Sequence, residues 1–469
     1  MVSRFIFSLA IMVIAATPAM AATAPHIDGA ALGLIWALPF AGILLSIAIL
    51  PLVAPSFWHH NFGKISAAWS LAFLIPITIQ AGVGVALYEL LHVLLLDYIP
   101  FIILLLALFT VAGGVKIGGT LAGTPTVNLT LLLFGTLLAG FMGTTGAAML
   151  MVRPLLSANH RRKHKVHIFV FFIFLVANIG GGLTPLGDPP LFLGFLKGVE
   201  FFWFTEHMIL PMLFAIALVG SAFFIVDSYY YRRESDYVRT HEPKRESLHI
   251  QGFLNIVLLA GVVGAVLMSG VWKPGIAFTL YHVPIEGQGL ARDAILLLIT
   301  FLSVRLTRQQ IRHDNEYSWG PIVEVAKLFA GIFITIIPAI AILRAGASGS
   351  LAGLVALANP GGVPSDPVYF WLTGILSSFL DNAPTFLVFF NLAGGDAQHL
   401  MGPMASTLLA ISAGAVFMGA NTYIGNAPNF MVKAVVEHRG VHMPSFFGYM
   451  AWSCAVLIPT FLLMTLLFF

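Results

Sequence analysis

The segment from Asn178 to Pro190 constrains the fold of this chain more than any other. It reads Asn-Ile-Gly-Gly-Gly-Leu-Thr-Pro-Leu-Gly-Asp-Pro-Pro, and apolar sequence flanks it on both sides. Each glycine weakens a helix by roughly 1 kcal/mol, and each proline removes a backbone donor and clashes with the preceding turn. At membrane depth, non-helical backbone is tolerated only where protein or a water-filled cavity satisfies its polar groups. The segment therefore predicts a membrane helix that is interrupted around a site.

The composition places the whole chain in a membrane. Of its 469 residues, 59% are hydrophobic and only 9% are charged, whereas a soluble globular protein has about 25% charged residues. We therefore predict an all-α polytopic membrane protein. The single cysteine, Cys454, excludes a disulfide framework and a multi-cysteine metal site. The sequence contains no phosphate-binding glycine loop, zinc-protease motif or nucleophile elbow, so we expect neither an enzyme nor a cofactor.

The first 21 residues have the pattern of a cleaved signal peptide. Arg4 precedes an apolar core at 5–16, and Ala19-Met20-Ala21 supplies the small residues of a cleavage site. A first membrane helix is the alternative, but the apolar run is shorter than the roughly 20 residues that a span requires. For this multi-pass protein, a cleaved signal peptide predicts a location in a bacterial inner membrane, with the mature N-terminus in the periplasm.

Hydropathy divides the rest of the chain into spans and two kinds of interrupted element. Spans are expected at 29–53, 65–87, 98–115, 208–230, 253–271, 294–304, 320–343 and 446–468, with His59, His60 and Lys64 in a loop before the second. Two runs are too long and too polar in the middle for a single span, and they predict re-entrant hairpins at 127–157 and 367–392. Broken helices at 168–197 and 403–437 follow them.

The two halves of the chain repeat each other. The stretch 144–147 (Thr-Thr-Gly-Ala) aligns with 381–384 (Asp-Asn-Ala-Pro), 237 residues later, and 186–192 aligns with 424–430, 238 residues later. We therefore predict two repeats, 29–246 and 253–469. Because Lys and Arg cluster in the loops 159–167, 232–246 and 305–313, these loops are expected in the cytoplasm, which opens the two hairpins to opposite sides. Inverted repeats with discontinuous helices are typical of secondary transporters.

The four interruptions carry the candidate binding residues. Hydroxyl, amide, carboxylate and freed carbonyl oxygens suit an alkali cation, whereas half-helix N-termini could instead present N–H groups to an anion. The candidates for binding a cation and a proton are Asp188, Asp381, Asn382, Thr144, Thr145, Thr184 and Asn426. Further cavity candidates are Asn178, Thr385, Asn421, Thr422 and Asn429. The Na⁺ ligands among them are expected to be Asp381, Asp188, Asn382 and Thr145.

Asp188 and Asp381 are the strongest of these candidates. An acid at bilayer depth costs several kcal/mol unless it is paired, solvated or neutralised. Desolvation favours its protonated form and a nearby cation favours its charged form, so such an acid can exchange a proton for Na⁺ at one site. The alternative is a carboxylate that only caps the helix after the break. For Asp188, which precedes two prolines, both readings stay open.

Two of these segments resemble a known group of transporters. The stretch 178–190 and the stretch 421–429 (Asn-Thr-Tyr-Ile-Gly-Asn-Ala-Pro-Asn) resemble the paired unwound helices of the ion transporter superfamily. That group includes citrate and dicarboxylate transporters, arsenite permeases and NhaD-type Na⁺/H⁺ antiporters. The resemblance covers nearly the whole mature chain. It implies a scaffold domain, a transport domain that carries both hairpins and both broken helices, a homodimer and elevator-like movement.

The details of the resemblance point to two subfamilies. The stretches 381–384 and 183–188 resemble NhaD-type antiporters, although 144–146 (Thr-Thr-Gly) stands where those carry a second Asp-Asn pair. Neither hairpin tip has the Ser-Asn-Thr of dicarboxylate carriers, yet 425–429 is similar to the anion carriers, and the chain resembles a divergent, citrate transporter-like branch.

The polar interruptions and the resemblance are compatible with two functions. The leading hypothesis is a Na⁺/H⁺ antiporter that exchanges cation and proton at a midplane site by alternating access. The alternative is a Na⁺- or H⁺-coupled transporter of citrate or another carboxylate. The expected partners are accordingly a small inorganic cation and a proton, or a carboxylate anion, together with membrane lipid and without nucleic acid. A non-transporting scaffold or sensor fits the polar interruptions less well.

Overall fold

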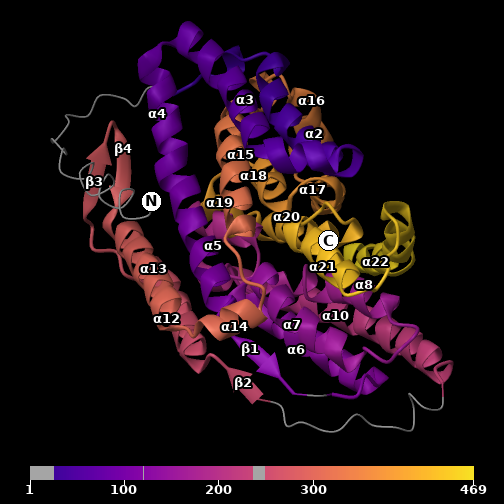
Figure 1. Cartoon of the computed structure of the whole chain (residues 1–469). Helices are drawn as coiled ribbons and strands as arrows, with labels where there is room; N and C mark the ends of the chain where they lie inside the picture. Colours follow the sequence, from indigo (N-terminus) through magenta and orange to yellow (C-terminus); the bar gives the residue numbers. More distant parts are fainter. Residues whose placement is uncertain (1–25, 120, 236–248) are drawn as a thin grey trace.

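The computed structural model describes residues 26–119, 121–235 and 249–469 and is built almost entirely of helices (Figure 1). Within those residues, eight helices are long and apolar enough to cross a membrane: Leu34–Val53, Pro55–Ala81, Val83–Ala112, Pro125–Met142, Phe201–Arg232, Phe253–Val271, Gly320–Arg344 and Phe446–Phe468. The predicted all-α polytopic membrane class is thus confirmed. The predicted signal peptide, 1–21, lies outside the described residues.

A set of uninterrupted helical segments forms what we call the framework. They are α2 (Leu38–Val53), α3 (Pro55–Ala81), α4 (Val83–Val93), the π-helix η4 (Leu94–Tyr98), α5 (Ile99–Ala112), α12 (Phe253–Val271), α13 (Gly287–Leu306) and α15 (Gly320–Arg344). Among them α3 packs on α2 and α15, and α13 packs on α5 and α12. The predictions for α12, α15 and the last helix, α22 (Phe446–Phe468), are correct to within one residue.

The predicted spans 65–87 and 98–115 are wrong at their starts. Helix α3 begins at Pro55 and contains the histidines that were expected in a loop, because a proline is well tolerated in the first helical turn. Gly82, with φ of 89°, then separates α3 from α4. Since apolar residues continue on both sides of this glycine, hydropathy alone does not reveal the boundary.

The interrupted elements lie against this framework. Helices α6 (Pro125–Met142) and α7 (Thr144–Ala158) pack on each other, as do α17 (Asp366–Phe379) and α18 (Asn382–Leu392). Helix α8 (Val166–Leu175) is separated from α9 (Pro189–Leu196) by the 3₁₀ turn η5 (Ile179–Gly182) and unwound backbone. Helix α20 (Ala405–Met418) is separated in the same way from α21 (Ala427–His438) by η8 (Gly419–Asn421). These bounds fall within two residues of the predicted hairpins and broken helices.

One hydrogen-bond pattern occurs in both halves of the chain. In the first half, Thr184 Oγ1 donates to the carbonyl of Gly140 at 2.5 Å. In the second half, Thr422 Oγ1 donates to the carbonyl of Ser378, and each of these residues lies 238 positions after its counterpart. Both hydroxyls also accept from the backbone N–H two residues on, at 3.1 and 3.2 Å. Each unwound segment is therefore fixed to its hairpin by the same local structure.

The constant spacing corrects the alignment of the hairpin tips by one residue. At 238 positions Thr144 corresponds to Asn382, whereas the sequence comparison at 237 set Thr144 against Asp381. Thr144 and Asn382 each begin the second arm of their hairpin. The apolar arms contain too few distinctive residues to fix the register from the sequence. The inverted orientation of the repeats stays a prediction.

Two short antiparallel strand pairs complete the fold, and neither was predicted. Strand β1 (Lys116–Gly118) pairs with β2 (His249–Gln251), and β3 (Ala277–Leu280) pairs with β4 (Val283–Glu286). The β3–β4 pair projects beyond the ends of α12 and α13 (Figure 1).

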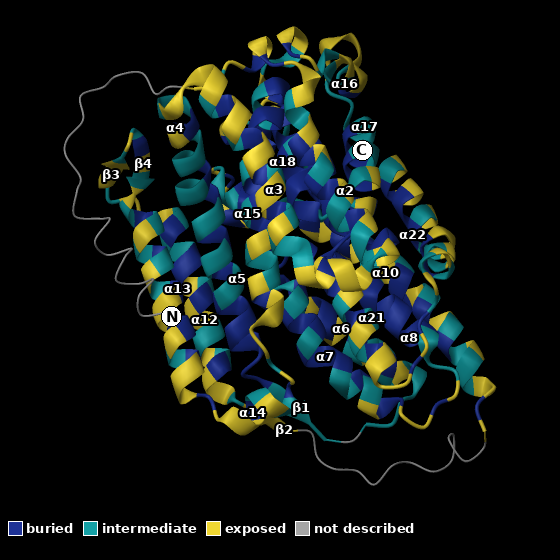
Figure 2. Ribbon diagram, turned by 45° about the horizontal axis from the view of Figure 1, so that its top comes forward, coloured by how far each residue is buried: buried dark blue, intermediate teal, exposed yellow. Residues whose placement is uncertain are grey.

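The broken helices and the framework helices differ in how far their side chains are buried. In α8 every side chain from His167 to Leu175 is buried, whereas α3 and α12 expose large apolar side chains such as Ile79, which is 80% exposed, and Val271, which is 83% exposed (Figure 2). Apolar residues that face outward from long helices are suited to lipid. The interrupted helices are thus held inside the protein, where their free backbone groups can be satisfied.

Candidate functional site

Asp188 lies where the four interruptions meet. Its Oδ1 accepts hydrogen bonds from Thr144 Oγ1 at 3.0 Å and from Asn426 Nδ2 at 3.3 Å, and its Oδ2 accepts one from Asn382 Nδ2. Thr144 and Asn382 come from the two hairpin tips, and Asn426 precedes α21. All four side chains are buried. We call these four residues the Asp188 cluster, to which each interruption contributes one side chain.

The local sequence explains why the Asp188 carboxylate faces the hairpin tips. Asp188 is extended, with φ of −142° and ψ of 144°, and its side chain makes no capping hydrogen bond to α9. Pro190, at the second helical position, has no N–H to donate to a capping carboxylate, and the N–H of Leu191 at the third position donates to the Asp188 carbonyl at 3.1 Å. Its counterpart Asn426 has nearly the same conformation, with φ of −151° and ψ of 140°. The capping interpretation of Asp188 is therefore wrong.

Glycines allow the unwound backbone to approach the cluster. A Cβ on Gly187 would lie 2.3 Å from the carbonyl oxygen of Gly181, and a Cβ on Gly181 would lie 2.7 Å from Thr144 Cγ2 and 2.8 Å from Asp188 Cβ. The backbone N–H of Thr144 also donates to the Gly187 carbonyl at 2.9 Å. The glycines of the first interruption are thus required by space at the site itself.

Asp381 has the capping role that was left open for Asp188. It is the N-cap of α18, and its Oδ1 accepts from the N–H of Ala383 at 3.2 Å. Its carbonyl accepts from Thr385 Oγ1 at 3.0 Å. It is only partly buried, one residue before Asn382. The structure therefore places one acid inside the cluster and the other at its edge, and ion binding by Asp381 stays a prediction.

Two of the asparagines join the unwound segments behind the cluster. Asn178 Nδ2 donates to Asn429 Oδ1 at 2.7 Å, and Asn178 Oδ1 accepts from Asn426 Nδ2 at 3.3 Å. Asn429 Nδ2 donates to the carbonyls of Gly419 and Thr422, each at 2.9 Å. These amides satisfy broken backbone and position Asn426 toward Asp188.

The remaining candidates lie outside the cluster. Thr184 and Thr422 bond to the hairpin arms as described above, and Asn421 Nδ2 donates to Ser378 Oγ at 2.9 Å. For Thr145, no hydrogen bond of the side chain occurs within residues 26–119, 121–235 and 249–469. The Na⁺ ligand that was expected at position 145 is thus not among the residues that the structure brings together, and its neighbour Thr144 is.

The electrostatics of the cluster favour a small cation. Within the described part of the chain, Asp188 forms no ion pair, and the buried Oδ1 of Asn382 has no hydrogen-bond partner. A buried carboxylate without a counter-charge is costly, and an unpaired amide oxygen beside it is a further oxygen ligand. The same residues contain no group of three or more His, Cys, Asp or Glu side chains that could hold a metal ion. A single carboxylate with hydroxyl and amide oxygens beside it can chemically take up a proton or act as part of a set of oxygen ligands.

The sequence analysis missed a second buried polar group. Asp227 Oδ1 accepts from Arg162 Nη2 at 2.5 Å and from His167 Nε2 at 2.8 Å, and its Oδ2 accepts from Asn128 Nδ2 at 2.9 Å. The signal was an acid within the apolar run of α10 (Phe201–Arg232), since an acid in a span requires a partner. Arg162 is 3% exposed, so this arginine of the basic loop at 159–167 is part of the packed structure.

Comparison with known proteins agrees with this architecture. No curated protein matches the chain. A family described as "Putative citrate transport" matches residues 29–469, a range that contains both hairpins, both broken helices and the whole Asp188 cluster. The chain therefore belongs to this family of citrate transporter-like membrane proteins within the ion transporter superfamily.

Proposed function

We propose that the protein is a secondary active transporter that exchanges a proton for a monovalent cation, Na⁺ first of all, at Asp188. The single observation that carries this proposal is the Asp188 cluster, in which a buried carboxylate without a counter-charge is surrounded by one side chain from each of the other three interruptions. Competition of a proton and a cation for one carboxylate couples their movements without any further component.

The exchange keeps the charge of the site constant. With a proton on its carboxyl group, Asp188 is neutral and can remain buried. When Na⁺ arrives, the proton leaves Asp188, and the carboxylate, the unpaired Oδ1 of Asn382 and the hydroxyl oxygen of Thr144 are the oxygen atoms that would hold the cation. Because these atoms come from both hairpins and from the first broken helix, movement of the interrupted elements as a unit would carry the occupied site.

Carboxylate transport coupled to the same cation is the second candidate. It is favoured by the family description, which names citrate. In that case Asp188 would hold the coupling cation, and the carboxylate anion would bind elsewhere, since the cluster contains no cationic side chain that could pair with it.

Proteoliposomes that enclose a pH-sensitive dye test the proposal. Na⁺, Li⁺ and K⁺ are added in separate runs, and uptake of labelled citrate is measured in parallel. We expect cation-driven proton release in the wild type and its loss by about 100-fold or more in Asp188→Asn, because an amide has no ionisable proton that a cation could displace. Asp381→Asn is the matched comparison, since it alters a neighbouring acid that caps a helix.

The two variants decide between the acids. Asp381→Asn is expected to keep the exchange, since asparagine caps a helix about as well as aspartate does. Wild-type exchange in Asp188→Asn together with an inactive Asp381→Asn would transfer the ion-binding role to Asp381. Citrate uptake without any cation-driven proton movement would reject antiport and leave the carboxylate transporter.

A further inference from the structure

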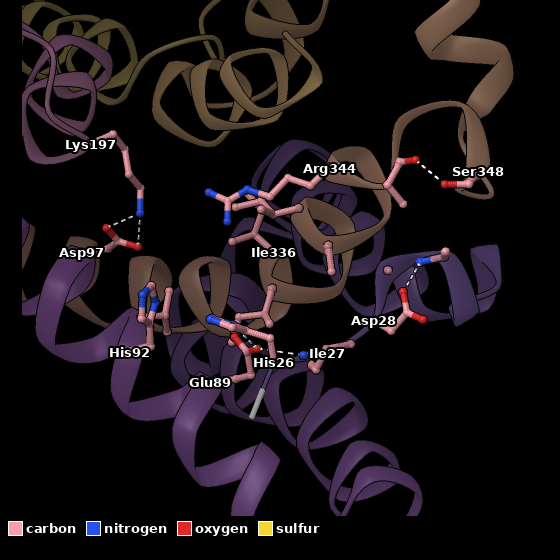
Figure 3. Close-up of a pocket in the computed structure, with 17 residues that line it drawn as sticks. His26, Ile27, Asp28, Glu89, His92, Asp97, Lys197, Ile336, Arg344 and Ser348 are labelled. Carbon is pink, nitrogen blue, oxygen red and sulfur yellow. Dashed lines mark hydrogen bonds and ion pairs between the residues drawn. The ribbon is translucent and has the colours of Figure 1, made fainter. Parts of the chain in front are cut away.

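A cavity of about 550 Å³ lies at the end of α9, the helix that begins directly after Asp188 (Figure 3). It is bounded by α4, η4 and α15 of the framework and by Lys197, which directly follows α9. Arg344, the last residue of α15, lines the same cavity and bonds to Asn391 near the end of α18. The volume lies in the range of pockets that bind small molecules.

Arg344 presents free donors to this cavity. Its Nε donates to Asn391 Oδ1 at 2.8 Å, which fixes the plane of the guanidinium group. Within the described residues its two Nη atoms have no hydrogen-bond partner. Figure 3 shows the guanidinium group directed across the cavity toward Lys197 and Asp97. Two N–H groups in one plane are the geometry that binds a carboxylate through both of its oxygens.

Lys197 supplies a second cationic group. Its ammonium nitrogen lies 2.6 and 2.7 Å from the two carboxylate oxygens of Asp97 in the π-helix η4. An ammonium group has three N–H donors, so one remains for a ligand after both contacts to Asp97 are made. The Lys197 and Asp97 side chains are 17% and 7% exposed, and the pair is therefore held in place at the wall of the cavity.

The other acids of the cavity already have partners. Glu89 accepts from the N–H of Ile27 at 3.1 Å and lies 3.4 Å from His26. Asp28 accepts from the N–H of Ala30 at 3.0 Å. The lining contains three carboxylates and two permanent cations. Lys197 is paired with Asp97, so Arg344 is the cation of the lining that forms no ion pair among the described residues.

From this arrangement we propose a second ligand site, which binds a small di- or tricarboxylate between Arg344 and Lys197. One carboxylate pairs with the Nη atoms of Arg344, and another accepts the remaining N–H of Lys197. The proposal goes beyond cation–proton exchange, which needs no anion. The proposed anion site is distinct from the Asp188 cluster. The helices that lead away from the cluster, α9 with 8 residues and α18 with 11, are about 12 and 16 Å long at 1.5 Å per residue.

Binding of citrate to the purified full-length protein tests this site. The protein is placed in nanodiscs of zwitterionic lipid, so that no anionic headgroup competes, and is titrated calorimetrically with citrate as its N-methylglucamine salt, without Na⁺. We expect saturable binding in the wild type and at least about tenfold weaker binding in Arg344→Gln, since a charge-assisted hydrogen bond is lost. Acetate, which has one carboxylate, is expected to bind more weakly than citrate.

Asp97→Asn is expected to change the citrate affinity in the opposite direction to Arg344→Gln. It removes the charge that competes for Lys197, so citrate binding is expected to become stronger, and general damage to the fold could not produce this result. Lys433→Gln is the matched control, because Lys433 pairs with Glu437 on α21 away from the cavity. It should bind citrate as the wild type does.

Two results would overturn the site: no citrate binding by the wild type, or equal affinities of the wild type, Arg344→Gln and Asp97→Asn. Because the titration contains no Na⁺ and measures no transport, its outcome is independent of the Asp188 exchange. A protein that binds citrate in this way but moves no protons would retain the anion site while rejecting the proposed antiport.

Discussion

Replacing Gly187 by alanine is expected to disable the site without touching any polar side chain. The new Cβ would lie 2.3 Å from the carbonyl oxygen of Gly181, about 1 Å closer than the 3.4 Å at which such contacts become ordinary. The obstacle is backbone and not the end of a flexible side chain, so the unwound segment has to move by about that distance. Asp188 is the next residue and moves with it.

The expected magnitude follows from this displacement. Misplacing a functional group by about 1 Å can cost on the order of 100-fold in rate, whereas overpacking of this kind typically costs 1–3 kcal/mol of stability. In proteoliposomes, the rate of Na⁺-driven proton release by Gly187→Ala should thus fall far below that of the wild type. The amount of the variant in the membrane should fall much less. A thermal unfolding curve of the purified protein measures the loss of stability separately.

Gly264→Ala is the control for this substitution. Gly264 lies in α12, and a Cβ there would meet nothing within 4 Å, so exchange should be unchanged. Gly425→Ala in the second interruption should reproduce the defect, because its Cβ would lie 2.5 Å from the Gly419 carbonyl oxygen. Wild-type exchange in Gly187→Ala would refute the claim that this close backbone contact positions Asp188.

Three further substitutions test the supporting structure. Asp227→Ala removes the nearer of two acids from the buried Arg162, whose Nη2 lies 2.5 Å from Asp227 Oδ1 and whose Nε lies 4.0 Å from Glu234 Oε1. The substitution should lower the unfolding free energy by about 3 kcal/mol, seen as a lower melting temperature. Asn429→Ala leaves two carbonyls of the second interruption without their donor and should cost about 1–3 kcal/mol in the same measurement. Finally, the hydrogen bond from Lys116 lowers the pKa of Asp314, so this contact stabilises the fold at neutral pH and is lost as the pH falls below about 4. The melting temperature of Lys116→Gln should therefore be lower than that of the wild type at pH 7, and the two should converge in acid; a difference that persists there would contradict the assignment.

The interruptions of the helices could be predicted because they depend on local chemistry. Clusters of glycine and proline break a helix wherever they occur, so 178–190 and 421–429 were identified from residue types alone. The repeat then predicted that the four breaks belong together, and the hydrogen bonds of Asp188 join a side chain from each. The roles of the two acids could not be predicted, because each precedes a helix and only the direction of the side chain distinguishes a cap from a cluster member.

Contacts between residues far apart in the chain could not be predicted from the sequence. Arg162 lies in a basic loop that hydropathy and charge assign to the membrane surface, and its burial depends on an acid 65 residues later. The cavity between Lys197 and Arg344 combines residues whose separation in sequence carries no pattern. Gly82 ends a helix within an apolar run, where composition gives no boundary.

The Arg162–Asp227 pair has a consequence for the biogenesis of this protein. Asp227 leaves the ribosome 65 residues after Arg162, so the arginine at the base of the first hairpin initially has no counter-charge. A buried guanidinium without a partner costs several kcal/mol, and Arg162 is therefore expected to remain in water until α10 is synthesised. We therefore expect the first hairpin, the first broken helix and α10 to complete their insertion together, because Asp227 near the end of α10 pairs with Arg162 at the end of the first hairpin.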